Sequence, residues 1–194
     1  MFFLFSERQR LLDRLGSFLG AGRGVRIRGA RLLLRPFRPA EIDDEWQALL
    51  TADPMSIATV PDEARFRARL RASGTMRDGW IDLAIDLDGD VIGRIQTFVP
   101  GDLPLPPGTF DLGIGLRAEA RGRGYGREAL SLFTDWLFDH EGAEVVEAAT
   151  EPANVAMRTV FDRVGWTQAG RLTEAGREWV VYRITRADRR VAGR

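Results

Sequence analysis

Apolar and polar side chains alternate most regularly over residues 80–99, "WIDLAIDLDGDVIGRIQTFV". Apolar residues take every second position up to the central Asp-Gly pair, and an apolar run resumes after it. Period-two alternation indicates a half-buried strand and an Asp-Gly pair favours a tight turn, so the segment predicts a β-hairpin. Asp82, Asp86, Asp88 and Asp90 lack the downstream glutamate of a calcium loop, and we expect them to form a solvated strand face.

Shorter runs of the same kind predict further strands and helices. In "TFDLGIGLR" (residues 109–117) one face is apolar and the other carries Asp111, Gly113 and Gly115. The bare face leaves room for an extended ligand, or the glycines only relieve crowding. The helix after this strand has one apolar side, formed by Ala129, Leu130, Phe133, Trp136 and Leu137. The other predicted strands are residues 31–37, 144–150, 166–172 and 178–185, and the other helices are residues 39–52, 61–72 and 154–164.

Composition limits the chemistry that the chain can perform. Its 194 residues, 44% of them hydrophobic, suit one well-buried domain, which we place at residues 25–190. The 28 basic and 28 acidic residues cancel, so no net charge attracts nucleic acid. The chain has no cysteine and one histidine, His140, which excludes disulfides, a cysteine nucleophile and a zinc site. It also has no lysine, which excludes Schiff-base chemistry.

The neutral total hides a basic N-terminus. Residues 1–40 carry nine arginines against two acidic residues, a net charge of +7, and the remainder carries −7. Residues 1–24 predict an amphipathic helical extension, followed by a flexible basic connector at residues 20–30. The helix packs on its own domain, pairs two copies as a homodimer, or attaches to a membrane surface. Charge interrupts the first apolar run, unlike in a signal peptide, and no run approaches the roughly 20 apolar residues of a membrane span, so we expect a cytoplasmic protein.

Three glycines alternate in "RGRGYGREAL" (residues 121–130), between the strand at 109–117 and the next helix. Glycine inside a helix costs roughly 1 kcal/mol against alanine, but it permits positive φ and lets a ligand approach the backbone. Free amides at a helix N-terminus favour a phosphate or pyrophosphate, and Arg121 and Arg123 add positive charge. The segment predicts an anion-binding loop, although it matches neither the Walker nor the dinucleotide-binding glycine pattern.

Two motifs resemble the GCN5-related N-acetyltransferase (GNAT) superfamily over about residues 31–185. Arg121, Gly124 and Gly126 stand at the defined positions of its R/Q-x-x-G-x-G/A signature. "FDLGIGLRAEARGRGYGREAL" and "EPANVAMRTVFDRVGW" are similar to two segments of the Rim type, the ribosomal-protein N-terminal acetyltransferases. The resemblance implies an α/β (α+β) GNAT fold with a central mixed, mostly antiparallel, twisted sheet of about six to seven strands and about four helices. It also implies a V-shaped split between the fourth and fifth strands.

The resemblance implies acetyl-CoA as co-substrate and no metal. The amides of residues 121–126 would hold its pyrophosphate, its pantetheine arm would lie beside the strand at 109–117, and Asn154 would contact that arm. Alternatives stay open, because Asn154 is also a good helix cap, Tyr125 either stacks on the cofactor or packs locally, and the arginines serve equally as surface charges. The implied cofactor-binding residues are Leu116, Arg121, Gly122, Arg123, Gly124, Tyr125, Gly126 and Asn154.

Proton affinities bear on the catalytic candidates. A terminal amine has a pKa near ~8, so roughly a tenth of it is unprotonated at neutral pH. The thiol of CoA has a pKa near ~8.5, so its thiolate leaves easily. This favours direct transfer between positioned reactants. In many GNAT enzymes a tyrosine donates a proton to the departing sulfur, and this chain has Phe161 at that position. Water, Ser131 or another hydroxyl then donates the proton, or the donation is dispensable. By resemblance the base is Asp111, with Glu151 as the second candidate; Asp111 is alternatively a carboxylate satisfied by its neighbours.

The resemblance implies an acetyl-CoA-dependent N-acetyltransferase that modifies a protein N-terminal α-amine. A small amine such as an aminoglycoside or polyamine is the alternative acceptor, which the net charge of −7 on residues 41–194 would suit. Rim-type relatives often carry an aromatic pair where this chain has Ile114 and Gly115, which leaves the acceptor open. Further alternatives are a CoA-binding protein without catalysis and an interaction module whose N-terminal helix binds a partner.

Overall fold

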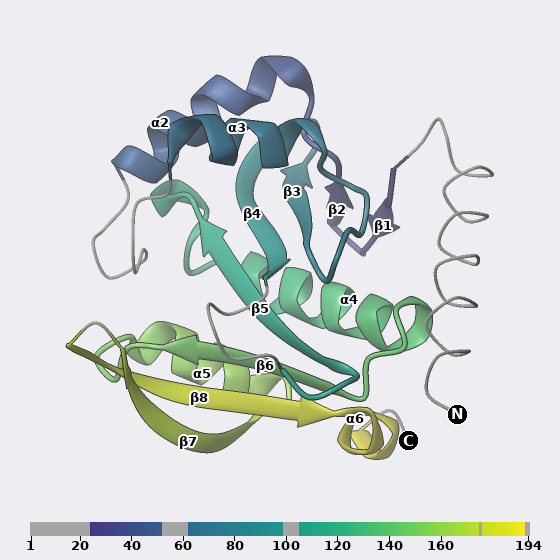
Figure 1. Cartoon of the computed structure of the whole chain (residues 1–194), viewed down its shortest axis with the longest axis vertical. Helices are drawn as coiled ribbons and strands as arrows, with labels where there is room; N and C mark the ends of the chain where they lie inside the picture. The colour runs from purple at the N-terminus through teal and green to yellow at the C-terminus, as the bar shows by residue number, and fades with distance from the viewer. Residues whose placement is uncertain (1–23, 52–61, 99–104, 175, 193–194) are drawn as a thin grey trace, which may run out of the picture.

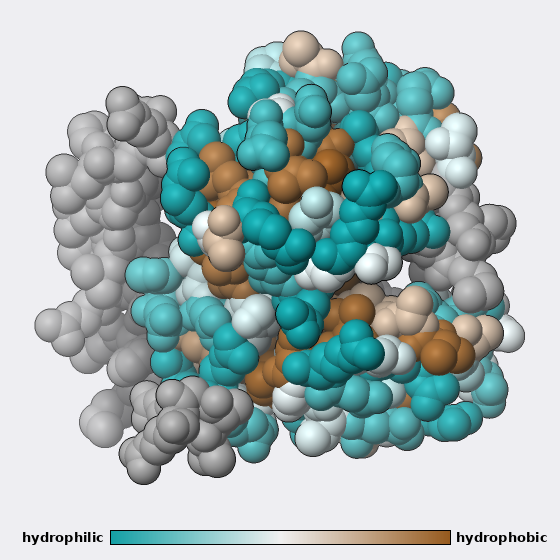
Figure 2. Space-filling model, turned by 180° about the vertical axis from the view of Figure 1, so that it is seen from behind, coloured by the Kyte–Doolittle hydropathy of each residue, from teal (hydrophilic) through white to brown (hydrophobic). Residues whose placement is uncertain are grey.

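The computed structural model (Figure 1) describes residues 24–51, 62–98, 105–174 and 176–192. The predicted N-terminal helix, with its proposed role in a homodimer, lies outside the described residues apart from Gly24. None of the described helices is long and apolar enough to cross a membrane. Seen from behind (Figure 2), hydrophilic residues cover most of the described surface, and hydrophobic residues show in smaller patches.

One sheet of eight strands runs through the described residues, in the order β1-β2-β3-β4-β5-β6-β8-β7. Neighbouring strands are antiparallel except β5 and β6, which are parallel. The sheet is therefore mixed and mostly antiparallel, as predicted, with one strand more than the upper expectation. The strands are β1 (Ile27–Arg28), β2 (Leu32–Arg35), β3 (Ile81–Leu87), β4 (Asp90–Phe98), β5 (Thr109–Leu116), β6 (Val145–Thr150), β7 (Thr167–Glu174) and β8 (Arg177–Thr185).

β5 and β6 pair only near their first residues. Thr109–Asp111 lie beside Val145–Glu147, and the C-terminal parts of the two strands are not paired with each other. Figure 1 shows the strands diverging from this shared end. The predicted V-shaped split between the fourth and fifth expected strands, residues 109–117 and 144–150, is thus confirmed. Beyond Asp111, β5 keeps a strand neighbour only on the β4 side, so its other edge faces the split.

Helices cover both faces of the sheet. Leu83 and Ile85 of β3 belong to a large hydrophobic cluster that includes Phe133 of α4. Ala84, between them, belongs to a smaller cluster with Phe66 of α3. Because successive strand residues point to opposite faces, the two clusters lie on opposite sides of the sheet. The helices are η1 (Pro39–Glu41), α2 (Ile42–Leu50), α3 (Glu63–Arg71), η3 (Ala118–Ala120), α4 (Tyr125–His140), α5 (Val155–Arg163) and α6 (Arg186–Ala192).

Besides the short helix η3, two elements are absent from the predicted order. β1 lies within residues 20–30, which the sequence pattern indicated to be a flexible connector; Ile27 pairs with Leu34, and Arg28 pairs with Leu33. A strand of two residues has too few positions to show alternation, so only its partner strand reveals it. α6 is a helix of 7 residues rich in charged side chains, and it lacks the apolar stripe that identifies a helix in sequence.

The solvated face predicted for the β3–β4 hairpin is wrong in its central part. The two aspartates nearest the turn are exposed, as expected, but Asp82 and Asp86 are only 3% and 5% exposed. Asp82 accepts a hydrogen bond of 2.8 Å from Arg69 of α3, and Asp86 accepts one of 2.7 Å from Arg35 of β2. The two carboxylates are buried because arginines from other elements cover them and compensate their charge.

Candidate active site

The glycine loop joins β5 to α4 by way of η3. Gly122 and Gly124 have φ angles of 73° and 81°, in the left-handed region that glycine adopts at least cost. Gly124 is also the N-cap residue of α4. Gly126 already lies in the helix, where a Cβ would sit 3.5 Å from Cδ1 of Leu116, at ordinary contact distance. The backbone turn therefore requires glycine at the first two of the three positions.

A row of backbone amides is free at the start of α4. The N–H groups from Gly122 to Arg127 donate to no acceptor among the described residues, and hydrogen bonding resumes at Glu128, whose N–H donates to the carbonyl of Gly124 at 3.1 Å. These donors lie at the positive end of the helix dipole, where a phosphate group is favoured. The side chains of Arg123 and Arg127 are exposed and form no ion pair with a described residue. The loop therefore offers free donors and positive charge to an anion, and anion binding there stays a prediction.

Hydrogen bonds from Arg31 connect the β1–β2 turn to the glycine loop and to α4. Its Nη1 donates to the carbonyl of Arg123 at 3.1 Å, and its Nε donates to the carboxylate of Glu128 at 2.8 Å. The backbone N–H groups of Arg31 and Leu32 donate to the same carboxylate. The guanidinium of Arg31 also lies 4.7 Å from the ring centre of Tyr125. Tyr125 therefore has a local packing partner, and stacking on the cofactor, its other predicted role, stays a prediction.

The edge of β5 that faces the split carries backbone groups that β4 does not pair, of which the N–H of Leu112 donates to the carboxyl group of Asp111. The N–H of Arg117 donates to the carbonyl of Ile92, so these two residues are a hydrogen-bonded pair of the β4–β5 ladder. Because such positions alternate along an antiparallel pair, every second residue of β5 directs its N–H and C=O away from β4. These residues are Leu112, Ile114 and Leu116. The carbonyl of Leu116 accepts from Nε of Arg121 at 3.0 Å, and this bond ties the loop to the strand end.

The glycine-bare face of β5 is open. A Cβ on Gly115 would meet no atom within 4 Å. Asp111 points to the same face as Gly113 and Gly115, since side chains at alternate strand positions share a face. The crowding that was the alternative explanation for these glycines therefore does not apply at Gly115.

Asp111 is the carboxylate with the strongest signs of a functional role among the described residues. Its Oδ1 is buried and has no hydrogen-bond partner among them. Burial, followed by the negative charges of Glu147 and Glu174, raises the pKa of Asp111 to about 7, against a smaller lowering by a backbone hydrogen bond from Leu112. The unpartnered oxygen favours the role of a base over that of a carboxylate satisfied by its neighbours, and the catalytic role stays a prediction. A base with a pKa near neutrality is well matched to proton transfer from an amine.

Ser131 and Glu151, the other predicted catalytic residues, are engaged elsewhere. The hydroxyl of Ser131 accepts a hydrogen bond of 2.7 Å from Arg189 of α6, which also pairs with Asp135. Glu151 forms an ion pair with Arg177 of β8. The structure does not bring either group into contact with Asp111, and we do not assign either of them a catalytic role.

Asn154 and Phe161 lie on α5. Oδ1 of Asn154 accepts from the N–H of Met157 at 3.1 Å, so Asn154 caps the helix. Phe161 is 1% exposed and stacks on Tyr182 of β8, with ring centres 4.7 Å apart. The hydroxyl of Tyr182 accepts from Nε of Arg158 at 3.3 Å. Phe161 therefore serves the aromatic core.

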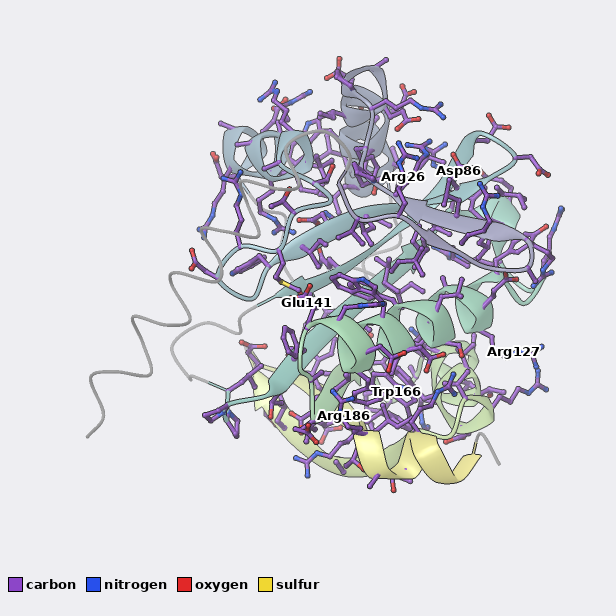
Figure 3. All side chains as sticks on the ribbon, turned by 90° about the vertical axis from the view of Figure 1, so that its right-hand side faces the viewer. Arg26, Asp86, Arg127, Glu141, Trp166 and Arg186 are labelled. Carbon is purple, nitrogen blue, oxygen red and sulfur yellow. The ribbon has the colours of Figure 1, made fainter. Side chains whose placement is uncertain are left out.

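A groove of about 1020 Å³ adjoins the glycine loop on the outer side of α4. Positive charge exceeds negative charge along its lining, which includes Arg31, Arg123, Arg127, Arg163 and Arg189 together with Glu128 and Asp162. Figure 3 shows Arg127 pointing outward from the first turn of α4. Among the described residues, no group of acidic or histidine side chains could hold a metal ion.

Glu147 and Glu174 are the residues that sequence reasoning missed. Both act on Asp111 electrostatically, from β6 and β7. Alternation in "EVVEAAT" already places Glu147 on the face opposite the buried Val146 and Ala148. The parallel pairing of β5 with β6, which the sequence did not predict, is needed to place Glu147 beside Asp111. Glu174 gave no such signal, because nothing in the sequence relates β7 to β5.

Curated relatives of similar sequence are acetyltransferases. The mycothiol acetyltransferase of Salinispora arenicola is 28% identical over 141 residues, which cover 70% of this chain and 44% of that protein. The mycothiol acetyltransferase of Pseudarthrobacter chlorophenolicus is also 28% identical, over 70% of this chain and 42% of that protein. The chain thus spans less than half the length of these relatives.

Solved structures share the fold. A GNAT-family acetyltransferase from Bacillus anthracis is 17% identical with a TM-score of 0.68, covering 83% of this chain and 98% of that one. The aminoglycoside acetyltransferase AAC(6')-Ib in complex with coenzyme A is 18% identical with a TM-score of 0.70, covering 84% and 99%. RimJ of Mycobacterium smegmatis, in complex with CoA-disulfide, is 22% identical with a TM-score of 0.64, covering 84% and 88%.

The match to a family model assigns the chain to a protein family. The model of the acetyltransferase (GNAT) domain matches residues 31–167, most of the chain. The matched range contains the glycine loop, the split between β5 and β6, and Asp111. The chain therefore belongs to the GNAT acetyltransferase family.

Proposed function

We propose that this chain is an acetyl-CoA-dependent N-acetyltransferase that transfers the acetyl group directly to a primary amine. The observation that carries the proposal is the row of free amides from Gly122 to Arg127, which follow the end of β5 that is not paired with β6. These donors suit the pyrophosphate of CoA. The backbone groups that β5 directs into the split around Ile114 suit the amide groups of its pantetheine arm, because an exposed strand edge offers donors and acceptors.

Asp111 is the base of the proposed reaction. Acetyl-CoA supplies an activated acetyl group as a thioester. The acceptor nitrogen forms a bond to the carbonyl carbon, the carbon–sulfur bond breaks, and Asp111 takes the proton that the nitrogen gives up. The thiolate takes a proton from solvent, which its pKa near ~8.5 permits without a dedicated acid. This agrees with Phe161, which stands where many relatives carry a tyrosine and has no proton to donate.

The acceptor that we favour is a protein N-terminal α-amine, by likeness to RimJ and the Rim-type motifs. A cationic small amine is the second candidate, because Glu147 and Glu174 add negative charge around Asp111. The aminoglycoside acetyltransferase of similar fold supports the same candidate. Both acceptors present a primary amine to the same base, so they share the mechanism and differ in what holds the rest of the molecule.

Calorimetric titration with acetyl-CoA tests the cofactor site. Gly124→Glu places a negative charge among the free amides, and a side chain at a φ of 81° is strained. We expect its affinity to fall by at least about 100-fold, which corresponds to roughly 2.7 kcal/mol. Gly142→Glu is the matched control, because Gly142 also has a positive φ of 68° with no atom near a Cβ, but lies beyond the far end of α4.

Equal weakening by both variants would mean that strain or unfolding explains the loss, and unchanged affinity in Gly124→Glu would contradict the proposed site. Thermal melting of the two variants checks that both are folded. If acetyl-CoA binds and no amine is acetylated, the chain is a CoA-binding protein without catalysis.

A further inference from the structure

Asp111 and Glu147 are direct neighbours across the parallel β5–β6 pair. They form the last register pair before the two strands separate. Residues opposite each other in a ladder direct their side chains to the same face. Two carboxyl groups therefore lie side by side at the closed end of the split, next to the open face of Gly113 and Gly115.

The charged groups around Asp111 come from three strands. Glu147 lies on β6, Glu174 on β7, and Arg183 on β8, where Arg183 donates from Nε to Oε1 of Glu147 at 2.6 Å. The β4 partner of Asp111 is Phe98, which does not titrate. Arg183 holds the carboxylate of Glu147 in place, but it forms no hydrogen bond with Asp111, whose Oδ1 has no partner among the described residues. Glu147 is thus fixed as a charge beside a carboxyl group that has one unpartnered oxygen.

We propose that Glu147 is a positioning residue of the reaction: its carboxylate, held beside Asp111 by the strand register and by Arg183, makes Asp111 a stronger base for the acceptor's proton. The inference rests on the proposed function, in which Asp111 is that base. Glu147 itself does not need to touch the acceptor. Its effect is that of a like charge, which disfavours the ionised form of its neighbour.

The need for such a charge follows from ordinary proton affinities. An aspartate with an unperturbed pKa near ~3.9 is a poor base for an amine, and each pKa unit gained is worth about 1.4 kcal/mol of proton affinity. Burial provides the largest part of the rise at Asp111, and Glu147 provides the next largest part, ahead of Glu174. Substitutions at these two glutamates should therefore change the basicity of Asp111 in that order.

Three substitutions separate charge from structure. Glu147→Gln removes the negative charge and keeps the shape, so the pKa of Asp111 should fall. Arg183→Gln removes the cation that partly neutralises Glu147, so the pKa of Asp111 should rise. A merely structural disturbance would not produce shifts of opposite sign. Glu178→Gln is the control, because Glu178 is an exposed glutamate of β8 that takes no part in raising the pKa of Asp111, and the same charge is removed.

The direct measurement is a carboxyl ¹³C NMR titration of the full-length protein without ligands, with the Asp111 signal identified by its loss in Asp111→Asn. We expect Asp111 to titrate near 7 in the wild type. In Glu147→Gln the midpoint should fall by more than about 0.5 pH units, in Arg183→Gln it should rise, and in Glu178→Gln it should stay unchanged. Glu174→Gln should give a fall smaller than that of Glu147→Gln.

A second readout is the pH profile of kcat/KM with one amine acceptor. The base must be deprotonated, so activity rises with pH through its pKa, and Glu147→Gln should move the acid limb to lower pH. Because the acceptor is the same in every variant, its own ionisation cancels. An Asp111 signal that titrates near 4, or a midpoint that Glu147→Gln leaves in place, would overturn the inference. The NMR titration needs no turnover, so it tests the coupling of the two carboxyl groups even if the proposed acetyl transfer is absent.

Discussion

Glu128 connects two distant parts of the chain through one carboxylate. It accepts hydrogen bonds from the backbone N–H groups of Arg31 and Leu32 and from Nε of Arg31. Burial alone would raise the pKa of Glu128, but these hydrogen bonds outweigh burial and lower it. The β1–β2 turn is thereby attached to the first turn of α4, directly behind the free amides.

Replacing this carboxylate should destabilise the protein. Glu128→Ala leaves two backbone N–H groups without their acceptor, and we expect a loss of about 1–3 kcal/mol in the free energy of unfolding by urea. Glu119→Ala, at an exposed site in η3, should have almost no effect. Because the folded pKa of Glu128 is lowered, its contribution is present above the unfolded pKa of about 4.3 and is lost as pH falls through the folded value. A stability difference that stays constant below pH 4 would contradict this assignment.

Features that depend on neighbouring residues in the sequence could be predicted, and contacts between residues far apart in the sequence could not. The left-handed turn at Gly122 and Gly124 follows from three alternating glycines before a helix, a purely local pattern. The partner of Glu128 is Arg31, 97 positions away in the sequence, and alternation contains no information about such a pair. For the same reason, resemblance and strand alternation pointed to Asp111 as a candidate base without indicating the groups that raise its pKa.

β5 packs closely against β4 along one edge, whereas the sheet face at Gly115 is open. A Cβ on Gly93 of β4 would overlap the carbonyl oxygen of Gly115, whereas a Cβ on Gly115 itself would meet nothing within 4 Å. Gly93 is therefore required by the close approach of β4 and β5. Gly115 is not required by packing, which leaves room for a ligand as its explanation.

Two substitutions test this asymmetry. Gly115→Val should leave the melting temperature nearly unchanged, because valine suits a strand and its Cβ would meet no atom within 4 Å, but it should lower kcat/KM for acetyl transfer at least about tenfold by filling the open face. Gly93→Ala should lower stability by about 1–3 kcal/mol, because the added methyl group forces the strands apart. Normal turnover in Gly115→Val would show that neither reactant uses this face.

Alternation predicted which residues of a strand share a face, but not what covers that face. The β3–β4 hairpin and its turn are confirmed, with the strands at Ile81–Leu87 and Asp90–Phe98. Asp82 and Asp86 occupy the predicted polar face, yet Arg69 and Arg35 cover them. Only the three-dimensional arrangement of α3 and β2 places those arginines there.

The two halves of the sheet are joined by a short parallel pairing and by the C-terminal helix. β5 and β6 are paired over only Thr109–Asp111 and Val145–Glu147, which leaves most of their length to the split. α6, which follows β8, returns to α4: Arg189 binds Asp135, and Nε of Arg186 donates to the carbonyl of Ala143 at 3.0 Å. These contacts hold the second half of the sheet against α4 while the split stays open beside the glycine loop.

The measurement that tests the central claim most directly is the release of CoA from acetyl-CoA by the full-length protein, with the acetylated product identified by mass spectrometry. The acceptors are N-terminal peptides, polyamines and aminoglycosides, and the comparison is with Asp111→Asn at pH 7 to 8. We predict one acetylated amine per CoA released, and a fall of at least about 100-fold in kcat/KM for Asp111→Asn. Turnover that Asp111→Asn leaves intact, or acetyl-CoA binding with no acetylated amine from any class, would contradict the account.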